Sequence, residues 1–353
     1  MEMREEMDKQ HIVVAYNASP EEQALLLEVL GSFATLTFLN ELPENDTVFA
    51  LSVRYCELTA LPESLGQLTN LQQLDLTGNQ LSSLPESIGN LIHLKKLYVD
   101  ENQLTALPES LENLIHLEEL HVDDNQLTAL PASIGRLTNL KTLNVYRNRL
   151  VSLPARLSQL TSLEELSVGR NQLIALPESF WQLKQLQTLN LAENQFSFLP
   201  ESIGNLINLH TLDLGHNQLT VLPESLGNLT NLKEMHLRNN QLVSLPESIG
   251  NLTSLKQLSL CDNRLRSLPE SLGNLTNLTN LDLRNNQLTS LPTSLSNLTS
   301  LAYLDLRANK LVSLPTSIGN LPNLEKLDVR WNKLSSLPVW IQRLEQRGCT
   351  VFT

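Results

Sequence analysis

Charged and aromatic side chains recur in this chain at intervals of 23 residues, so they form rows and not one compact cluster. The richest set lies between residues 98 and 170 and combines carboxylates with aromatic and basic groups: Tyr98, Asp100, Glu101, His121, Asp123, Asp124, Tyr146, Arg147 and Arg170. Carboxylates beside aromatic rings suit recognition of a cationic protein surface, in which charge governs association rate and partner choice. A solvated acidic face that only aids solubility is the alternative interpretation of this set.

A second pattern lies nearer the C-terminus. It consists of two rows, Asp282, Asp305 and Asp328 beside Arg284, Arg307 and Arg330, with Tyr303 and Trp331 next to them. Between the two sets, the ninth repeat adds His236 and Arg238 as further outward candidates. Two interpretations remain open. The rows can neutralise each other as exposed ion pairs, each worth only ~0–1 kcal/mol, or they can bind a partner anchored by the two aromatic residues.

Motifs for catalysis are missing from the sequence. It holds no phosphate-binding loop, no Gly-x-Ser-x-Gly and no His-Glu-x-x-His, and its seven histidines are scattered. The three cysteines, Cys56, Cys261 and Cys349, lie too far apart in sequence to suggest a zinc site. We therefore expect no catalytic residue, no cofactor and no metal ion, and not an enzyme.

The element that positions these side chains is a repeat of 23 residues without insertions. A clear copy begins at Leu71 and reads Leu-x-x-Leu-x-Leu-x-x-Asn-x-Leu-x-x-Leu-Pro. The alternation x-Leu-x-Leu-x predicts a short strand with leucines inward and the x residues outward. An asparagine amide both donates and accepts, so Asn79 and its equivalents can satisfy backbone groups where each strand ends. Stacked copies predict a solenoid with one parallel sheet.

The second half of each repeat predicts a short outer segment. The Leu-Pro pair fixes its entry, and the following Glu-Ser suits a helix N-terminus. Pairs such as Gly89-Asn90 are expected to end it because both residue types tolerate left-handed backbone. These elements together predict an α/β fold.

The repeat resembles the leucine-rich repeat family in its 23-residue form with Leu-Pro-x-x-Leu-x-x-Leu. It is similar to the intracellular, Ras-associated class and its bacterial relatives. The resemblance covers residues 48–346 and implies a right-handed solenoid, or horseshoe, with a concave parallel sheet and short convex helical or 3-10 segments. It also implies a role in binding proteins, usually on the concave sheet.

Three regions follow from the repeat pattern. Residues 1–47 predict an N-terminal cap of strand, helix and strand, with a small docking element as the alternative. Residues 48–346 hold thirteen repeats, the first of which has Cys56 in the asparagine position. Residues 347–353 predict a C-terminal cap or edge strand.

Composition limits the partner and the compartment. The formal charge of -13 and the pI near 5.0 argue against nucleic acid or an anionic membrane as the main partner. No apolar run approaches the roughly 18 residues that span a bilayer, and the charged N-terminus lacks a signal-peptide pattern. We expect a monomeric protein that is cytoplasmic, or secreted into a host cell if it is a bacterial effector. The alternatives are the recognition part of a multi-chain enzyme or signalling regulator, and an extracellular adhesin.

Overall fold

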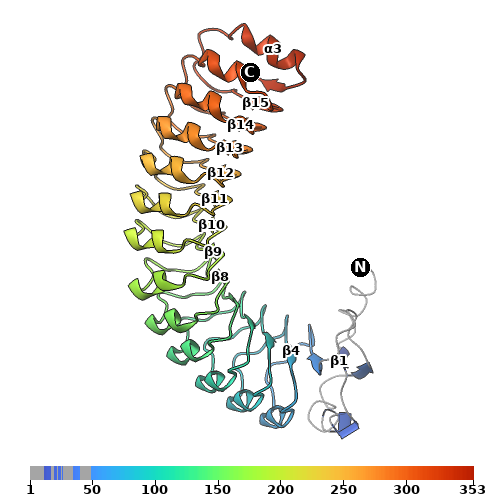
Figure 1. Cartoon of the computed structure of the whole chain (residues 1–353). Coiled ribbons are helices and arrows are strands. Elements are labelled where there is room, and N and C mark those ends of the chain that lie inside the picture. The colour runs from blue at the N-terminus through green and yellow to red at the C-terminus, as the bar shows by residue number, and fades with distance from the viewer. Residues whose placement is uncertain (1–11, 17–19, 22, 25, 27–34, 40–48) are drawn as a thin grey trace. The chain divides into compact units, whose positions relative to one another are not determined.

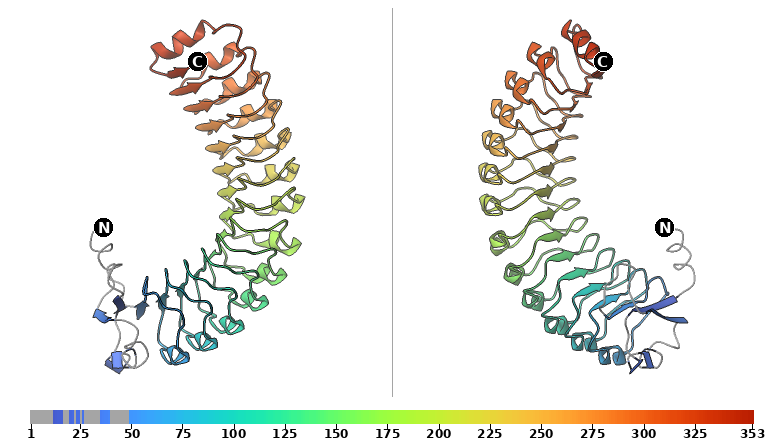
Figure 2. Two further views of the ribbon diagram at one scale, coloured as in Figure 1. Left: turned by 180° about the vertical axis from the view of Figure 1, so that it is seen from behind. Right: turned by 45° about the vertical axis from the view of Figure 1, so that its right-hand side comes forward.

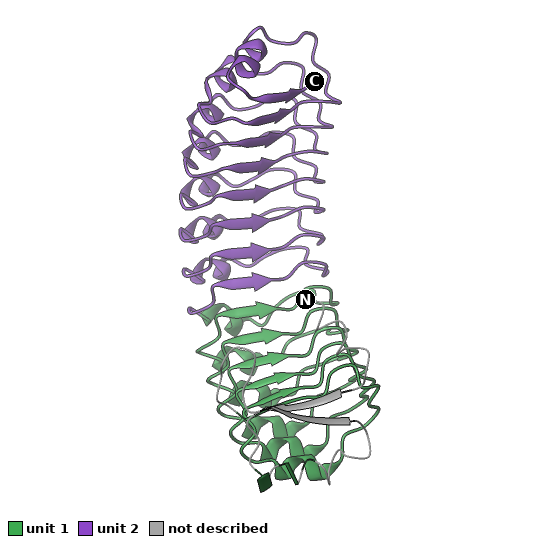
Figure 3. Ribbon diagram, turned by 90° about the vertical axis from the view of Figure 1, so that its right-hand side faces the viewer, with its two compact units in different colours: residues 1–183 green, residues 184–353 purple. Residues whose placement is uncertain are grey.

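A computed structural model describes residues 12–16, 20–21, 23–24, 26, 35–39 and 49–353 (Figure 1). The chain divides into two compact units, Met1–Leu183 and Lys184–Thr353, which are coloured separately in Figure 3. Both units are built from the same repeat, so the elements recur at 23-residue intervals in each.

Unit 1 holds one sheet with the strand order β8-β7-β6-β5-β4-β3-β1-β2. Strands β3 to β8 are parallel with matched register, whereas β1 runs antiparallel to β3 and parallel to β2. The bounds are β1 Ile12–Tyr16, β2 Thr35–Leu39, β3 Ala50–Ser52, β4 Gln73–Asp75, β5 Lys96–Tyr98, β6 Glu119–His121, β7 Thr142–Asn144 and β8 Glu165–Ser167.

The segment predicted as an N-terminal cap contributes β1, β2 and helical residues at 20–21, 23–24 and 26. Because β1 pairs with β3, it occupies the edge of the first repeat strand. The rest of residues 1–47 lies outside the described residues, and the role of this segment as a cap stays a prediction.

Unit 2 also holds one sheet, and all its strands are parallel. The bounds are β9 Thr188–Asn190, β10 Thr211–Asp213, β11 Glu234–His236, β12 Gln257–Ser259, β13 Asn280–Asp282, β14 Tyr303–Asp305, β15 Lys326–Asp328 and β16 Thr350–Phe352. Strand β16 comes from the C-terminal tail and pairs with β15.

The outer segments are short 3-10 helices, and within each unit they lie on the side opposite the strands (Figure 2). Their bounds are η1 Glu63–Gln67, η2 Glu86–Asn90, η3 Glu109–Asn113, η4 Ala132–Arg136, η5 Ala155–Gln159, η6 Glu178–Gln182, η7 Glu201–Asn205, η8 Glu224–Asn228, η9 Glu247–Asn251, η10 Glu270–Asn274, η11 Thr293–Asn297 and η12 Thr316–Asn320. The last repeat has the α-helix α3, Trp340–Gln346, in this place. The predicted fold class is thereby confirmed.

Buried asparagines bond neighbouring repeats together, as predicted. Asn102 Nδ2 donates to the carbonyl oxygen of Leu76 in the preceding repeat at 3.0 Å and to that of Val99 at 3.1 Å. Its Oδ1 accepts the Leu81 N–H at 3.0 Å. The side chain is only 8% exposed. Each such amide forms hydrogen bonds with buried backbone groups, which the leucine side chains of the core cannot do.

The prediction that Gly89-Asn90 end the outer segment through left-handed backbone is wrong. Neither residue has a positive φ; instead, the residue directly before each repeat asparagine is left-handed, as at Glu101 with φ 52°. Gly89 stands at a position with no room for a side chain, because a Cβ there would lie 2.5 Å from the backbone oxygen of Ser110 in the next outer segment. Glycine therefore permits close stacking of the 3-10 helices.

Candidate functional site

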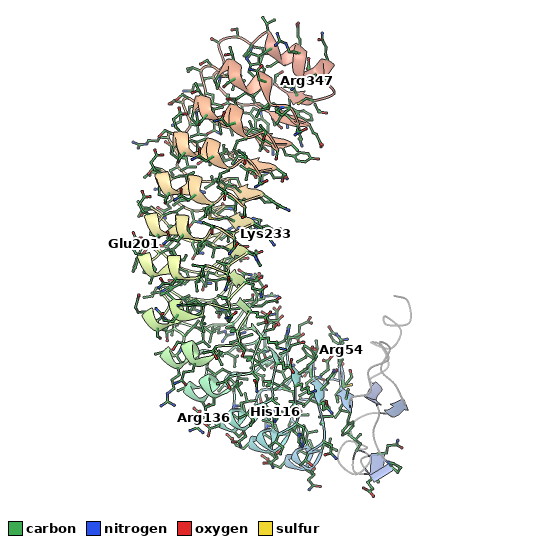
Figure 4. The ribbon with its side chains drawn as sticks, viewed as in Figure 1. Arg54, His116, Arg136, Glu201, Lys233 and Arg347 are labelled. Atoms are coloured by element: carbon green, nitrogen blue, oxygen red, sulfur yellow. The ribbon has the colours of Figure 1, made fainter. Side chains whose placement is uncertain are left out.

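The strand side of unit 1 carries an open hollow whose lining includes four of the predicted site residues. Strands β5 and β6 place Tyr98 directly opposite His121, with ring centroids 5.0 Å apart. Asp100 and Asp123 follow the same two strands. We name as the acidic hollow the set that lines it: Arg54, Asp75, Thr77, Tyr98, Asp100, His121, Asp123 and Asn144. Figure 4 shows Arg54 on the strand side and Arg136 on the outer side of this unit.

Tyr98 is held in a fixed position at the hollow. Its hydroxyl donates to Glu119 Oε2 at 2.5 Å, and Lys96 Nζ lies 3.1 Å from the other oxygen of that carboxylate. Burial and the bond to Glu119 raise the pKa of Tyr98 well above its usual range. Burial opposes ionisation of Glu119, but bonds from Tyr98 and Lys96 outweigh it and lower the pKa of that carboxyl. Tyr98 thus presents a neutral, pre-oriented ring.

Two carboxylates in the acidic hollow form no ion pair with a lysine or arginine within the described part of the chain. Asp100 accepts a bond from Thr77 Oγ1 at 3.1 Å, and Asp123 accepts one from Asn144 Nδ2 at 2.7 Å. Burial raises the pKa of both groups. The pKa of Asp123 reaches about 6, through burial first and then the neighbouring Asp100 and other carboxylates. The hollow therefore concentrates negative charge that the chain leaves uncompensated.

Replacing Asp123 by asparagine is expected to stabilise the protein at pH 7. A pKa raised in the folded state means that ionised Asp123 disfavours folding above pH 6, and that this penalty disappears as pH falls toward 3.8, the ordinary pKa of an aspartate. After discounting for partial exposure, we expect a gain of about 1 kcal/mol in the free energy of unfolding at pH 7 and almost none at pH 4. Urea unfolding of both proteins at the two pH values checks this, and a gain that is equal at both would contradict it.

Other acidic groups of this region are already paired. Asp75 lies 3.3 Å from Arg54 Nε, and Asp124 lies 2.5 Å from Arg147 Nη1. Arg147, Asp124, Asn125 and Glu101 line a separate hollow beside the first. The predicted residues Tyr146, half-buried, and Arg170, exposed, follow β7 and β8 and do not line the acidic hollow.

On the strand side of unit 2, the Asp and Arg rows neutralise each other. Arg307 donates to Asp305 through Nε at 2.9 Å and Nη2 at 2.6 Å, and its Nε also lies 3.4 Å from Asp328. The other two pairs join Arg284 to Asp282 at 3.4 Å and Arg330 to Asp328 at 2.6 Å. This geometry favours the ladder interpretation for the charged rows.

The aromatic residues of the same region are exposed. Trp331 is 71% exposed and Tyr303 is 44% exposed. The guanidinium of Arg330 lies 5.4 Å from the Trp331 ring centroid and 4.9 Å from that of Phe352, so cation–π contacts hold it in addition to Asp328. Tyr303 lines a small hollow with Lys326 and the aspartate row. The other four predicted residues here lie outside its lining: Arg284, Arg307, Arg330 and Trp331.

His236 and Arg238 line neither of the two hollows. His236 ends β11, with Nε2 3.9 Å from Glu234, and Arg238 follows it and lies against Gly215. Strand β12 separates them from the aspartate row.

The acidic hollow includes four residues that were not predicted as site residues: Arg54, Asp75, Thr77 and Asn144. The sequence could have indicated three of them, because Asp75, Thr77 and Asn144 occupy outward positions of the repeat. Arg54 belongs to the degenerate first repeat, in which the pattern is weaker. Across the described residues, no set of three His, Cys, Asp or Glu side chains is placed to hold a metal ion.

Comparison with protein families settles the relationship. A model described as "Leucine-rich repeat region" matches residues 50–121, 87–177 and 169–290, and one described as "Leucine rich repeat" matches residues 276–334. The chain belongs to the leucine-rich repeat family. None of the curated proteins matches it significantly. In the described part of this leucine-rich repeat protein, no helix has the length and apolar character needed to cross a bilayer.

Solved structures of other leucine-rich repeat proteins are similar. A leucine-rich repeat protein of Leptospira interrogans is 34% identical with a TM-score of 0.73, over 90% of this chain and 83% of its own. An internalin of Listeria monocytogenes is 26% identical with a TM-score of 0.76, over 87% and 89% of the two chains. The Arabidopsis receptor kinase HAESA, solved with a peptide hormone and a co-receptor, is 26% identical with a TM-score of 0.67, over 90% of this chain and 60% of its own.

Proposed function

We propose that this leucine-rich repeat protein is a non-catalytic interaction module that binds a protein partner with a basic surface at the acidic hollow of unit 1. The observation that carries the proposal is the pair Asp100 and Asp123, two half-buried carboxylates that form no ion pair with a lysine or arginine among the described residues. In unit 2 the aspartates of the row Asp282, Asp305 and Asp328, two positions earlier in the repeat, each face an arginine of the chain itself. A basic side chain of a partner would supply the missing charge in unit 1.

The fixed ring of Tyr98 adds to this surface. Its hydroxyl is bonded to Glu119 and its ring contacts His121, so its orientation is set before a partner arrives. Pre-oriented aromatic groups lose little conformational entropy on binding. That HAESA was solved with a peptide hormone is consistent with peptide or protein binding by this family.

We propose that the chain binds its protein partner in the cytoplasm. Cys56, Cys261 and Cys349 are all unpaired and buried, which suits a reducing compartment. The net charge of -13 disfavours nucleic acid and anionic membranes as partners.

Capture from host cytosol with identification by mass spectrometry tests the proposal. Wild type is compared with Asp100→Asn/Asp123→Asn and with Glu201→Gln/Glu247→Gln, which removes the same charge from exposed outer-side carboxylates of unit 2. We expect a partner that the first variant binds at least about tenfold more weakly, and that the second retains. High salt should weaken binding of wild type more than of the first variant.

The variants separate loss of binding from loss of fold, because Asp123→Asn is expected to stabilise the chain. Equal weakening by both double variants would show a bulk charge effect and contradict a site at the acidic hollow. Full binding by the Asp100→Asn/Asp123→Asn variant would move the site elsewhere. Reproducible turnover by the purified chain would contradict a non-catalytic role.

A further inference from the structure

The last repeat of unit 2 is covered on two sides. Helix α3 packs against η12, where Trp340 lies over Gly319 and Leu344 is fully buried. Strand β16 pairs with β15 on the strand side. The connecting segment 331–339 runs between β15 and α3, and two of its leucines are more exposed than their equivalents in earlier repeats. Figure 1 shows β15 and α3 at this end of the chain.

The exposed side chains of this segment include core leucines. In the preceding repeat, Leu311 is 0% exposed and Leu314 is 6% exposed. Their equivalents are Leu334, half-buried, and Leu337, which is 51% exposed.

Two further apolar side chains of the segment are exposed, Val339 at 85% and Trp331 at 71%. We name Trp331, Leu334, Leu337 and Val339 the terminal apolar patch. The positions of Leu334 and Leu337 are buried in the other repeats, where the next repeat covers them, so these two side chains are core side chains without their cover. Trp331 and Val339 stand at positions that are at least partly exposed in earlier repeats too and extend the apolar surface.

Backbone groups beneath the patch are also unpaired. In the preceding repeat, the Leu311 N–H donates to Asn332 Oδ1 at 3.1 Å, and the Leu311 carbonyl accepts the Lys333 N–H at 2.9 Å. The N–H and the carbonyl of Leu334 have no hydrogen-bond partner in the part of the chain that the structure describes. The segment therefore presents both the apolar and the polar groups that one repeat offers to the next.

The cover that fits such a surface is another leucine-rich repeat surface, and a second copy of the chain supplies one. Its N-terminal side is not open for stacking, because β1 already pairs with β3 there. At the C-terminal end, β16 and α3 cover the last repeat on two sides and leave Leu334 and Leu337 uncovered between them. A two-fold axis between two copies would bring the patch leucines of one copy against the same leucines of the other. The nearby α3 exposes both Arg343 and Glu345, so the same surface can meet itself with opposite charges in reach.

We infer that two copies of this chain associate through their terminal apolar patches as a two-fold dimer. This replaces the monomer that the sequence alone led us to expect. The interface belongs to unit 2 and shares no residue with the lining of the acidic hollow, so binding of a basic partner and dimer formation can be tested by separate substitutions.

Sedimentation velocity of the full chain from about 1 to about 200 µM tests the dimer. Leu337→Asp places a charge in the patch at a side chain that is already half exposed, so folding is retained. The two-fold axis places the new charge on both sides of the interface. We therefore expect the dissociation constant of the dimer to rise about a hundredfold or more. Val312→Asp is the matched control, since Val312 is 55% exposed one repeat earlier, outside the patch. It should leave the dimer intact.

Cross-linking gives a second readout. The three native cysteines are buried, so a Leu337→Cys variant offers one accessible thiol among the described residues. A short bis-maleimide should link two copies through that thiol and should not link two Val312→Cys chains. A wild-type chain that stays monomeric over the whole range, or a dimer that Leu337→Asp leaves unchanged, overturns the inference. Equal weakening by Val312→Asp overturns it as well.

Discussion

Replacing Asn240 by alanine is expected to lower the free energy of unfolding by about 3 kcal/mol or more. Asn240 Nδ2 donates to the carbonyl oxygens of Leu214 at 2.9 Å and Leu237 at 3.1 Å, and its Oδ1 accepts the Leu219 N–H at 2.9 Å. Alanine leaves these buried backbone groups without partners and without room for several waters. Leaving a buried polar group unpaired costs about 1–3 kcal/mol each. Urea unfolding followed by circular dichroism measures the loss.

Asn231 provides the control for this prediction. It is exposed, and its Nδ2 donates only to the carbonyl oxygen of Ile207 at 2.9 Å. Water can replace that bond, so Asn231→Ala should cost less than about 1 kcal/mol. Equal losses in the two variants would show that the buried amide ladder is not what bonds the repeats together.

Replacing Gly250 by alanine is expected to lower the free energy of unfolding by about 2–4 kcal/mol. A Cβ at this position would lie 2.4 Å from the backbone oxygen of Ser271 and 2.8 Å from its Cβ. Because the first contact is with backbone, a rotamer change cannot relieve it. The outer segments η9 and η10 would have to move apart, and the leucine core between them would lose packing. Thermal unfolding measures the effect.

Ser296→Ala is the matched control for the glycine substitution. Ser296 occupies the same place in its repeat, and η11 already accommodates a Cβ there. The variant loses only a bond from Ser296 Oγ to the carbonyl oxygen of Thr293 at 3.0 Å. We expect a change within about 1 kcal/mol. A comparable loss in both variants would mean that the close approach is not the reason for glycine.

The fold was predictable because its signals are periodic and each has one physical meaning. Leucines with period two place a strand, and an asparagine after it has buried backbone groups to satisfy. Glycine was different, because left-handed backbone and close approach both favour it, and sequence does not distinguish them. Gly89 is present for space, and the left-handed position is filled by residues such as Glu101.

The candidate site was predictable only in part. The sequence places six carboxylates and one lysine on the outward positions of repeats two to four, a net charge of -5. It does not show which carboxylates are neutralised, because side-chain conformations decide this. Asp124 faces Arg147, whereas Asp123 next to it faces Asn144. Likewise, Arg307 bonds to Asp305 on its own strand more closely than to Asp328 on the next.

The left-handed residue before each asparagine accepts very different side chains. The position runs from Tyr55 and Gly78 to Ala308 and Trp331, with φ between 50° and 70°. For a non-glycine residue this backbone costs about 1–2 kcal/mol, and the repeat accepts that cost for side chains as different as Asp124, Ala308 and Trp331. Exchanging one non-glycine residue for another there changes the surface without changing the scaffold. The repeat thus offers surface positions whose side chains can change independently of the fold, so new binding specificities can be selected one side chain at a time.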